Sequence, residues 1–259
     1  MKTKLFILFL LVNIAVAVFA ADKVEQADSA YMNEDYATAI KLYKEAASEE
    51  GVSTDLYYNI GNAYYRNGQN GKAILYYSRA LKLDPTNEDA MTNLDFVKTK
   101  IVDKQDDNLT LTEKVDENIV TLFTADGWAI VTFISFLLLI LCIVGYIFLN
   151  AVRYRKISFF MGLILIISTI FCIIYSFKSA KRISSDSSAI IIDESVQLST
   201  SPRVAKDKSE QAYFLHEGTR LEIVDSVRVS TDAENPLWYE VVVDNTHRAW
   251  ISAKSVEKI

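Results

Sequence analysis

The sequence has only two cysteines and two histidines among its 259 residues. Cys142 and Cys172 both lie inside long apolar runs, so they supply neither a disulfide framework nor the ligand spacing of a zinc site. His216 and His247 have no serine, cysteine or metal-ligand partner at a recognisable spacing. A glycine loop that cradles phosphate and a nucleophile paired with a base are absent as well. We therefore expect a protein without enzymatic activity, and without a cofactor or a metal ion.

An excess of basic residues is also lacking. The chain has 27 lysine and arginine residues against 33 aspartate and glutamate residues, which gives a net charge of -6. Proteins that bind nucleic acid normally present a basic face. We therefore expect no nucleic-acid partner.

Hydrophobic residues make up 51% of the chain, and many of them concentrate in three apolar segments. In the first segment, Lys2 and Lys4 precede an apolar run that ends on small residues, which predicts a secretory signal peptide over residues 1–20. Cleavage is expected between Ala20 and Ala21. The alternative is an uncleaved membrane anchor, which would leave the following residues on the same side of the membrane.

The other two apolar segments are residues 128–149 and 157–177, and neither contains a charged residue. About 20 apolar residues cross a bilayer as a helix, so both segments are predicted transmembrane helices. The loop 150–156 between them carries three basic residues, and the positive-inside bias places it in the cytoplasm. The flanking segments then both lie outside the cytoplasm. The spans lack ionisable residues, which argues against a transporter or pump.

Two aromatic residues lie at the outer boundaries of these spans. Trp128 begins the first span and Tyr175 lies near the end of the second, where aromatic rings suit the membrane interface. Cys142 and Cys172 fall at different depths in the two spans. They are predicted to be packing residues.

Residues 21–105 have helical periodicity and contain two similar segments. Aligning EDYATAIKLYKEAA with QNGKAILYYSRALKLDP gives a constant offset of 34 (73 minus 39, 77 minus 43, 80 minus 46), which is the tetratricopeptide period. Small residues let two helices approach closely, tyrosines fill the space beside them, and a proline ends the second helix. Residues 54–87 resemble a tetratricopeptide repeat at its signature positions: Tyr57, Ile60, Gly61, Tyr64, Ala73, Tyr77, Ala80 and Pro85.

The units on either side of this repeat are less regular. The first unit has Ala30 where an aromatic is expected and lacks the closing proline, but it keeps Ala27, Ala39, Tyr43 and Ala46. A further helix is expected after Thr86 as N-cap, with Asp89 three residues on. It resembles the capping helix of a repeat array and would turn three side chains inward: Met91, Leu94 and Val97. The prediction for residues 21–105 is an all-α array of two repeats and a cap.

Repeats of this kind line a concave groove with their first helices. Seven residues of the second repeat and the cap are predicted to face it: Tyr58, Asn59, Asn62, Tyr65, Arg66, Asn93 and Lys100. By resemblance, Asn59 and Asn93 would hold the backbone of a bound peptide, and the cations Arg66 and Lys100 would face a carboxylate. The alternative is that these are solvated polar residues on an exposed face.

Residues 106–127, between the cap and the membrane, are predicted to be an amphipathic segment with one apolar helical face from Leu111 on. Its apolar stripe would contain Val115, Ile119, Leu122 and Phe123. A helix on the outer membrane surface and a helix in contact with the array or a partner are equally good interpretations. The sequon-like Asn108-Leu109-Thr110 is treated as a chance match.

After a polar linker at 178–188 the pattern changes to short alternating segments, which predict a small all-β barrel over residues 189–259. Tyr239, Val241 and Val243 are expected to share one face of a strand. The turn signals between segments are Ser201-Pro202, Glu217-Gly218 and Asp244-Asn245.

This region resembles a bacterial SH3-type domain. The matching features are Glu217-Gly218-Thr219 before a strand, Trp238-Tyr239 in the next, and Ala249-Trp250-Ile251 near the end. The family usually has a glycine before the last tryptophan, whereas this chain has Ala249, and that departure bears on any inherited binding of cell-wall peptide. The aromatic residues Tyr213, Trp238 and Trp250 are expected in the core rather than on a ligand platform.

The order of these parts along the chain resembles the BatE family of aerotolerance-operon membrane proteins. The resemblance implies a bacterial inner-membrane protein that works beside von Willebrand A-type membrane proteins and a MoxR-type ATPase. The prediction is a multidomain membrane protein: a non-enzymatic scaffold with both soluble domains outside the cytoplasm, recruiting protein or peptide partners. The alternative is a sensor or adaptor whose SH3-like domain binds a peptidoglycan peptide.

Overall fold

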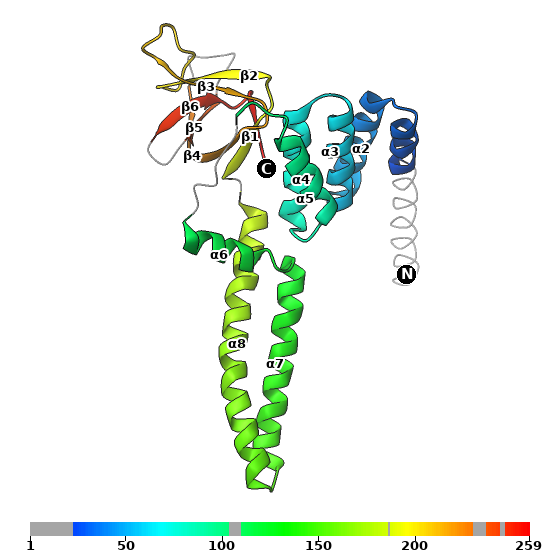
Figure 1. Ribbon diagram of the computed structural model, residues 1–259, viewed down its shortest axis with the longest axis vertical. Coiled ribbons are helices and arrows are strands. Elements are labelled where there is room, and N and C mark those ends of the chain that lie inside the picture. The colour runs from blue at the N-terminus through cyan, green and yellow to red at the C-terminus, as the bar shows by residue number, and fades with distance from the viewer. Residues whose placement is uncertain (1–22, 104–109, 186, 230–236, 244–246) are drawn as a thin grey trace, which may run out of the picture. The chain divides into compact units, whose positions relative to one another are not determined.

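The computed structural model describes residues 23–103, 110–185, 187–229, 237–243 and 247–259 (Figure 1). The predicted signal peptide, Asn108 of the sequon-like match and the Asp244-Asn245 turn lie outside these residues. The chain divides into two compact units. The first contains the helical array and the β-sheet, and the second contains the helices between them in sequence.

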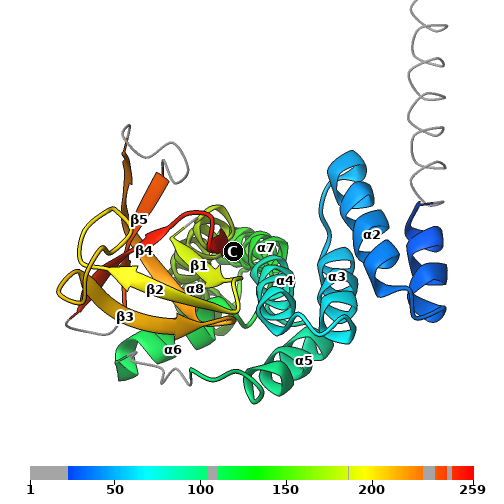
Figure 2. The same ribbon diagram turned by 90° about the horizontal axis from the view of Figure 1, so that it is seen from above.

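The array begins with a helix over residues 23–32. It continues with α2 (Tyr36–Glu50), α3 (Thr54–Arg66), α4 (Asn70–Leu83) and α5 (Glu88–Lys98), which follow one another in Figure 2. The side chains of Asp35, Ser53 and Asn87 each accept a hydrogen bond from a backbone N–H in the first turn of the next helix. The prediction that Thr86 caps α5 was wrong, because its hydroxyl donates to Asp84 instead and Asn87 takes the capping position.

Close packing of α3 against α4 confirms the predicted role of the small residues. A Cβ atom placed on Gly61 would lie 2.7 Å from Cδ1 of Tyr77, closer than two carbon atoms can pack. Ala73 and Ala80 are completely buried, as are Ala27, Ala39 and Ala46 of the first repeat. In the cap, Leu94 and Val97 are buried as predicted, but Met91 is 46% exposed and Ala90 takes its place in the core.

The second half of the first unit is a seven-stranded antiparallel sheet in the order β3-β2-β6-β5-β4-β1-β7. Its strands are β1 (Ser188–Ile191), β2 (Ser195–Ser199), β3 (Gln211–His216), β4 (Arg220–Arg228), β5 (Leu237–Val242), β6 (Arg248–Ser252) and β7 (Val256–Lys258). Among the described residues the sheet is open, with β3 and β7 at its edges, so the prediction of a closed barrel is not confirmed. The first alternating segment also forms two strands, β1 and β2, and β3 was not predicted.

The core of the sheet agrees with the predicted alternation. Val241 is completely buried, and Tyr239 and Val243 pack against the same cluster. Trp238 is 3% exposed, which confirms it as a core residue, whereas Trp250 is half-buried. The predicted turn at Glu217-Gly218 is present, and Gly218 adopts a φ of 84°, which favours glycine.

The sheet contacts the outer side of α4. The Arg79 guanidinium donates to the carbonyl of Lys258 and forms an ion pair of 2.9 Å with Glu257, which covers the edge strand β7. The backbone N–H of Gly71 donates to Oε2 of Glu217 at 2.9 Å. Ile190 of β1 belongs to the hydrophobic core of the array. The array and the sheet therefore share part of one core.

A second contact lies where the chain leaves the array. Asp103 accepts hydrogen bonds from the backbone N–H of His216 at 2.6 Å and from the hydroxyl of Thr219 at 2.9 Å, and Nδ1 of His216 lies 3.1 Å from its other oxygen. Burial opposes ionisation of Asp103, but the hydrogen bonds from His216 and Thr219 outweigh it and lower the pKa of the carboxyl. His216 has no partner at a recognisable spacing in the sequence, and in the structure its partner is Asp103.

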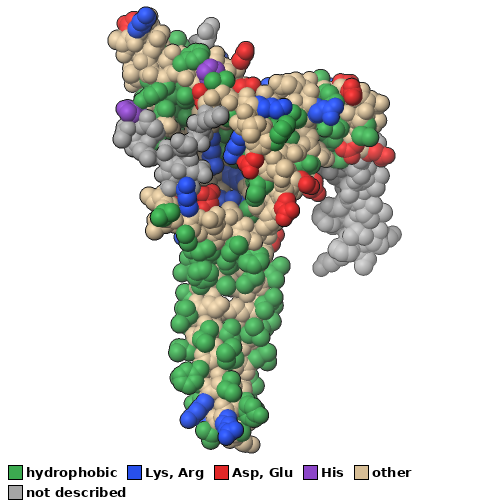
Figure 3. Space-filling model, viewed as in Figure 1, with side chains coloured by type: hydrophobic (Ala, Val, Ile, Leu, Met, Phe, Trp, Pro, Cys, Tyr) green, Lys and Arg blue, Asp and Glu red, His purple; other side chains and the backbone are tan. Residues whose placement is uncertain are grey.

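The second unit contains α6 (Leu111–Val120), α7 (Ala125–Phe148) and α8 (Val152–Ser184). Both α7 and α8 are long and apolar enough to cross a membrane, and Figure 3 shows their apolar side chains on the surface. The Thr169 hydroxyl donates to the carbonyl of Leu165, so the 2.8 Å contact between Ser135 and Thr169 is a hydrogen bond donated by Ser135. Such bonds between helices hold membrane hairpins together.

The helix α6 packs on α8 and differs from the predicted amphipathic helix. It ends at Val120, so Leu122 and Phe123 follow it instead of extending its stripe. Asp116 accepts a hydrogen bond from Tyr175 at 3.0 Å. Trp128 is buried rather than open to the surroundings, because its indole N–H donates to the carbonyl of Val120 and its ring stacks on Tyr175.

The contact between the array and the sheet predicts that replacing Gly71 by alanine destabilises this contact. Alanine ordinarily stabilises a helix relative to glycine by up to about 1 kcal/mol. In Gly71→Ala, however, the new Cβ would lie 2.9 Å from the carbonyl oxygen of Ile191 and 3.0 Å from the backbone nitrogen of Gly218. We expect faster hydrogen–deuterium exchange in residues 188–192 and 215–219, measured on the full-length protein in detergent.

Gly162→Ala in α8 is the matched control, because its Cβ would meet its nearest neighbour at an ordinary 3.7 Å. It should leave exchange in the sheet unchanged. If Gly71→Ala instead slowed exchange in α4 and left exchange in the sheet unchanged, the contact between the array and the sheet would be contradicted.

Candidate peptide-binding groove

The helix 23–32, α3 and α5 are the first helices of successive units, and in repeats of this kind the first helices line the concave face. On α3, Asn59 and Asn62 are separated by three residues and so lie on neighbouring turns of one face. Asn93 on α5 lies one period of 34 beyond Asn59 (93 minus 59). The structure thus places the predicted asparagines along one surface.

A hydrogen-bond network joins three of the predicted groove residues. Oδ1 of Asn62 accepts hydrogen bonds from the Tyr77 hydroxyl at 2.6 Å and from Nδ2 of Asn93 at 3.0 Å. Nδ2 of Asn93 also lies 3.3 Å from the Tyr58 hydroxyl oxygen. Asn62 and Asn93 are therefore engaged with their own chain, and they fix α3, α4 and α5 relative to one another.

Asn59 differs from these residues because its side chain has no hydrogen-bond partner in the described part of the chain. It lines a pocket of about 300 Å³ between the helix 23–32 and α3. The complete lining consists of Asp28, Tyr31, Met32, Tyr43, Asn59 and Asn62. An amide that can donate and accept, at the edge of a pocket of this size, can bind a peptide group.

An equivalent hydrogen bond from a tyrosine hydroxyl occurs in both repeats. The Tyr43 hydroxyl donates to Asp28, as the Tyr77 hydroxyl donates to Asn62, and the period of 34 relates the two pairs (77 minus 43, 62 minus 28). Burial, ahead of the hydrogen bond to Asp28, raises the pKa of Tyr43, and burial also raises the pKa of Tyr77. Both hydroxyls therefore keep their protons at neutral pH and act as donors.

The predicted cations lie outside this pocket and have partners. The Arg66 guanidinium lies 3.9 Å from Oε1 of Glu34 and stacks over the ring of Tyr36. Lys100 donates to the hydroxyl of Tyr65 at 2.6 Å. The structure thus pairs Lys100 with Tyr65, and neither cation lines the pocket beside Asn59.

Four pocket residues were not predicted from the sequence: Asp28, Tyr31, Met32 and Tyr43 in its role as a lining residue. The repeat offset contained the signal for two of them. Asp28 takes the place of Asn62, and Tyr31 takes the place of Tyr65 (62 minus 34, 65 minus 34). The prediction placed the groove only on the second repeat and the cap, and so it omitted the residues of the first repeat.

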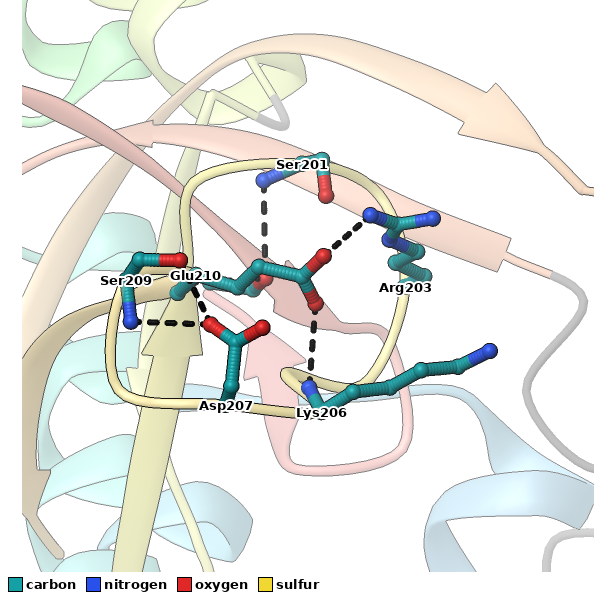
Figure 4. A network of polar contacts seen from close by, with 7 residues as sticks. Ser201, Arg203, Lys206, Asp207, Ser209 and Glu210 are labelled. Atoms are coloured by element: carbon teal, nitrogen blue, oxygen red, sulfur yellow. Dashed lines mark hydrogen bonds and ion pairs between the residues drawn. The ribbon is translucent and has the colours of Figure 1, made fainter.

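The sheet has a separate polar feature in the loop between β2 and β3. Glu210 forms an ion pair with Arg203 and accepts the backbone N–H of Lys206 at 3.0 Å, as Figure 4 shows. Hydrogen bonds from Ser209 lower the pKa of Asp207 in the same loop. The network gives the loop a defined shape, with the side chain of Lys206 exposed.

Comparison with known families identifies one part of the chain. Residues 54–87 match the tetratricopeptide repeat, which confirms the repeat formed by α3 and α4. No curated protein matches the chain. Tetratricopeptide repeats mediate contacts between proteins, so this match implies a protein partner.

The hydrogen bond from Tyr77 to Asn62 is expected to stabilise the array. Tyr77→Phe removes only the donor, and we expect a loss of about 1 kcal/mol in the free energy of local unfolding of α3 and α4. Hydrogen–deuterium exchange of the amides in these helices measures this quantity. Tyr57→Phe is the matched control, because the Tyr57 hydroxyl has no hydrogen-bond partner among the described residues. Equal losses in the two variants would contradict the assignment.

Proposed function

We propose that this protein is a non-enzymatic membrane scaffold that recruits a protein partner by binding an extended segment of it in the groove of the array. The observation that carries the proposal is the pocket beside Asn59, where an unpartnered amide borders about 300 Å³ of open groove. The neighbouring Asn62 is held by Tyr77 and Asn93, so the groove has a defined shape before a partner arrives. Such preorganisation lowers the entropic cost of binding.

The proposed location is the bacterial inner membrane, with array and sheet both outside the cytoplasm. The contacts of Arg79 with Glu257 and of Asp103 with His216 join segments from before and after α7 and α8. Two consecutive spans return the chain to the side from which it started, so the contacts and a transmembrane hairpin are mutually consistent. The basic residues at the start of α8 support a cytoplasmic turn. The resemblance to the BatE family suggests von Willebrand A-type membrane proteins as partners, in an aerotolerance or envelope-stress complex.

A second candidate function is the binding of a cell-wall peptide by the sheet, which we infer to be an open variant of an SH3-type domain. The favouring observation is the loop between β2 and β3, in which Glu210 orders the backbone while Lys206 and Lys208 remain exposed. Exposed lysines suit the carboxylates of a peptidoglycan peptide. Trp238 takes no part in this surface because it is buried.

The groove proposal predicts that Asn59→Ala weakens partner binding without destabilising the array. Truncation removes the amide that would bond the peptide backbone, and a lost hydrogen bond of about 1 kcal/mol lowers affinity about fivefold. Crosslinking of the full-length protein in intact cells, followed by mass spectrometry, measures the recovery of attached proteins. Asn67→Ala is the matched control, because Asn67 is exposed at the end of α3.

Unchanged recovery with Asn59→Ala would refute the groove as the binding site. Sedimentation of the full-length protein with peptidoglycan, without a recovered membrane protein, would favour the second candidate instead.

The location predicts the outcome of reporter fusions. Fusions within residues 105–112 and 183–188 should both be active outside the cytoplasm, and a fusion at the turn 149–151 between α7 and α8 should be active inside. Two reporters are compared at each site: an enzyme that is active only after export and a protein that fluoresces only in the cytoplasm. Together they show on which side of the membrane each site lies. Cytoplasmic activity at either of the first two sites would overturn the proposed topology.

A further inference from the structure

The pocket beside Asn59 has an acidic and aromatic lining. Asp28 is the only charged residue among the described residues that line it, and Tyr31 and Tyr43 provide aromatic rings. Met32 is 81% exposed at its edge, where a flexible thioether can adapt to a bound side chain. Carboxylates and aromatic rings are groups that attract cations.

The negative charge of Asp28 is not needed for the packing of the array. In the second repeat the equivalent tyrosine, Tyr77, donates to a neutral amide, Asn62, so a neutral acceptor is sufficient for this hydrogen bond there. Any acceptor would therefore serve Tyr43. The tyrosine occupies Oδ1 of Asp28, and Oδ2 has no hydrogen-bond or ion-pair partner in the described part of the chain.

Arg66 does not form an ion pair with this carboxylate. Arg66 interacts electrostatically with the hydroxyl of Tyr31. The Arg66 guanidinium, however, pairs with Glu34 and stacks over the ring of Tyr36. Lys100 lies at the other end of the groove with Tyr65. The charge of Asp28 thus remains available to a ligand.

We propose that the pocket lined by Asp28, Tyr31 and Tyr43 binds a lysine or arginine side chain of the peptide that lies in the groove. This inference rests on the proposed function, since it assigns the chemistry of one position in the bound segment. The Asp28 carboxylate would pair with the cation, and the aliphatic part of the side chain would lie against the rings. A carboxylate at that position would be repelled.

A peptide library tests this assignment on the full-length protein in detergent micelles. Four pools of acetylated and amidated octapeptides carry lysine, arginine, glutamate or leucine at one central position and random residues elsewhere. We expect the lysine and arginine pools to be retained about three- to tenfold more than the other two. Asp28→Asn keeps an acceptor for Tyr43 and should abolish this preference.

Asp55→Asn is the matched control, because it removes one exposed negative charge from α3 outside the pocket. It should leave the preference for lysine and arginine intact. An unchanged preference in Asp28→Asn, or an equal loss in Asp55→Asn, would overturn the assignment. Equal retention of all four pools would also overturn it while leaving the groove in place, whereas retention of none would refute the groove itself.

Discussion

The close approach of α3 and α4 is the constraint on which the rest of the first unit depends. Gly61 leaves no room for a methyl group beside the Tyr77 ring, so the two helices are held at one separation. At that separation the Tyr77 hydroxyl reaches Asn62, which in turn receives Asn93 from the cap. The groove therefore takes its shape from a packing contact behind it. The positions of its polar residues depend on the packing of α3 against α4.

The same helix serves two surfaces. On its inner side, α4 supplies Tyr77 to the groove network, and on its outer side it supplies Arg79 and the backbone of Gly71 to the sheet. The edge strand β7, which would otherwise offer unpaired backbone groups, is covered by Arg79. An open sheet is thus stabilised at one edge by a neighbour from the other end of the chain, without closing on itself.

The repeat that the sequence predicted correctly depends on local contacts, whereas several of the missed features depend on residues far apart in the chain. The repeat at 54–87 was readable because each helix of an array packs on the next, so the offset of 34 records its geometry directly. The strand β3 was missed because Ala212 to Leu215 is an unbroken apolar run, and its pairing depends on a loop ordered by Glu210. The partner of His216 lies 113 residues away, a separation at which no periodicity applies. In the groove, family resemblance indicated where asparagines lie but not that Glu34 and Tyr36 would hold Arg66.

The contact between Arg79 and Glu257 closes a loop of 178 residues that contains the whole apolar hairpin. The entropy lost in closing a loop grows only with the logarithm of its length, about 0.6 kcal/mol for each doubling. The length of the intervening chain therefore adds little to the cost of joining the sheet to α4. During synthesis, however, β7 emerges after both apolar helices, so β7 cannot cover the outer side of α4 until those helices have been made.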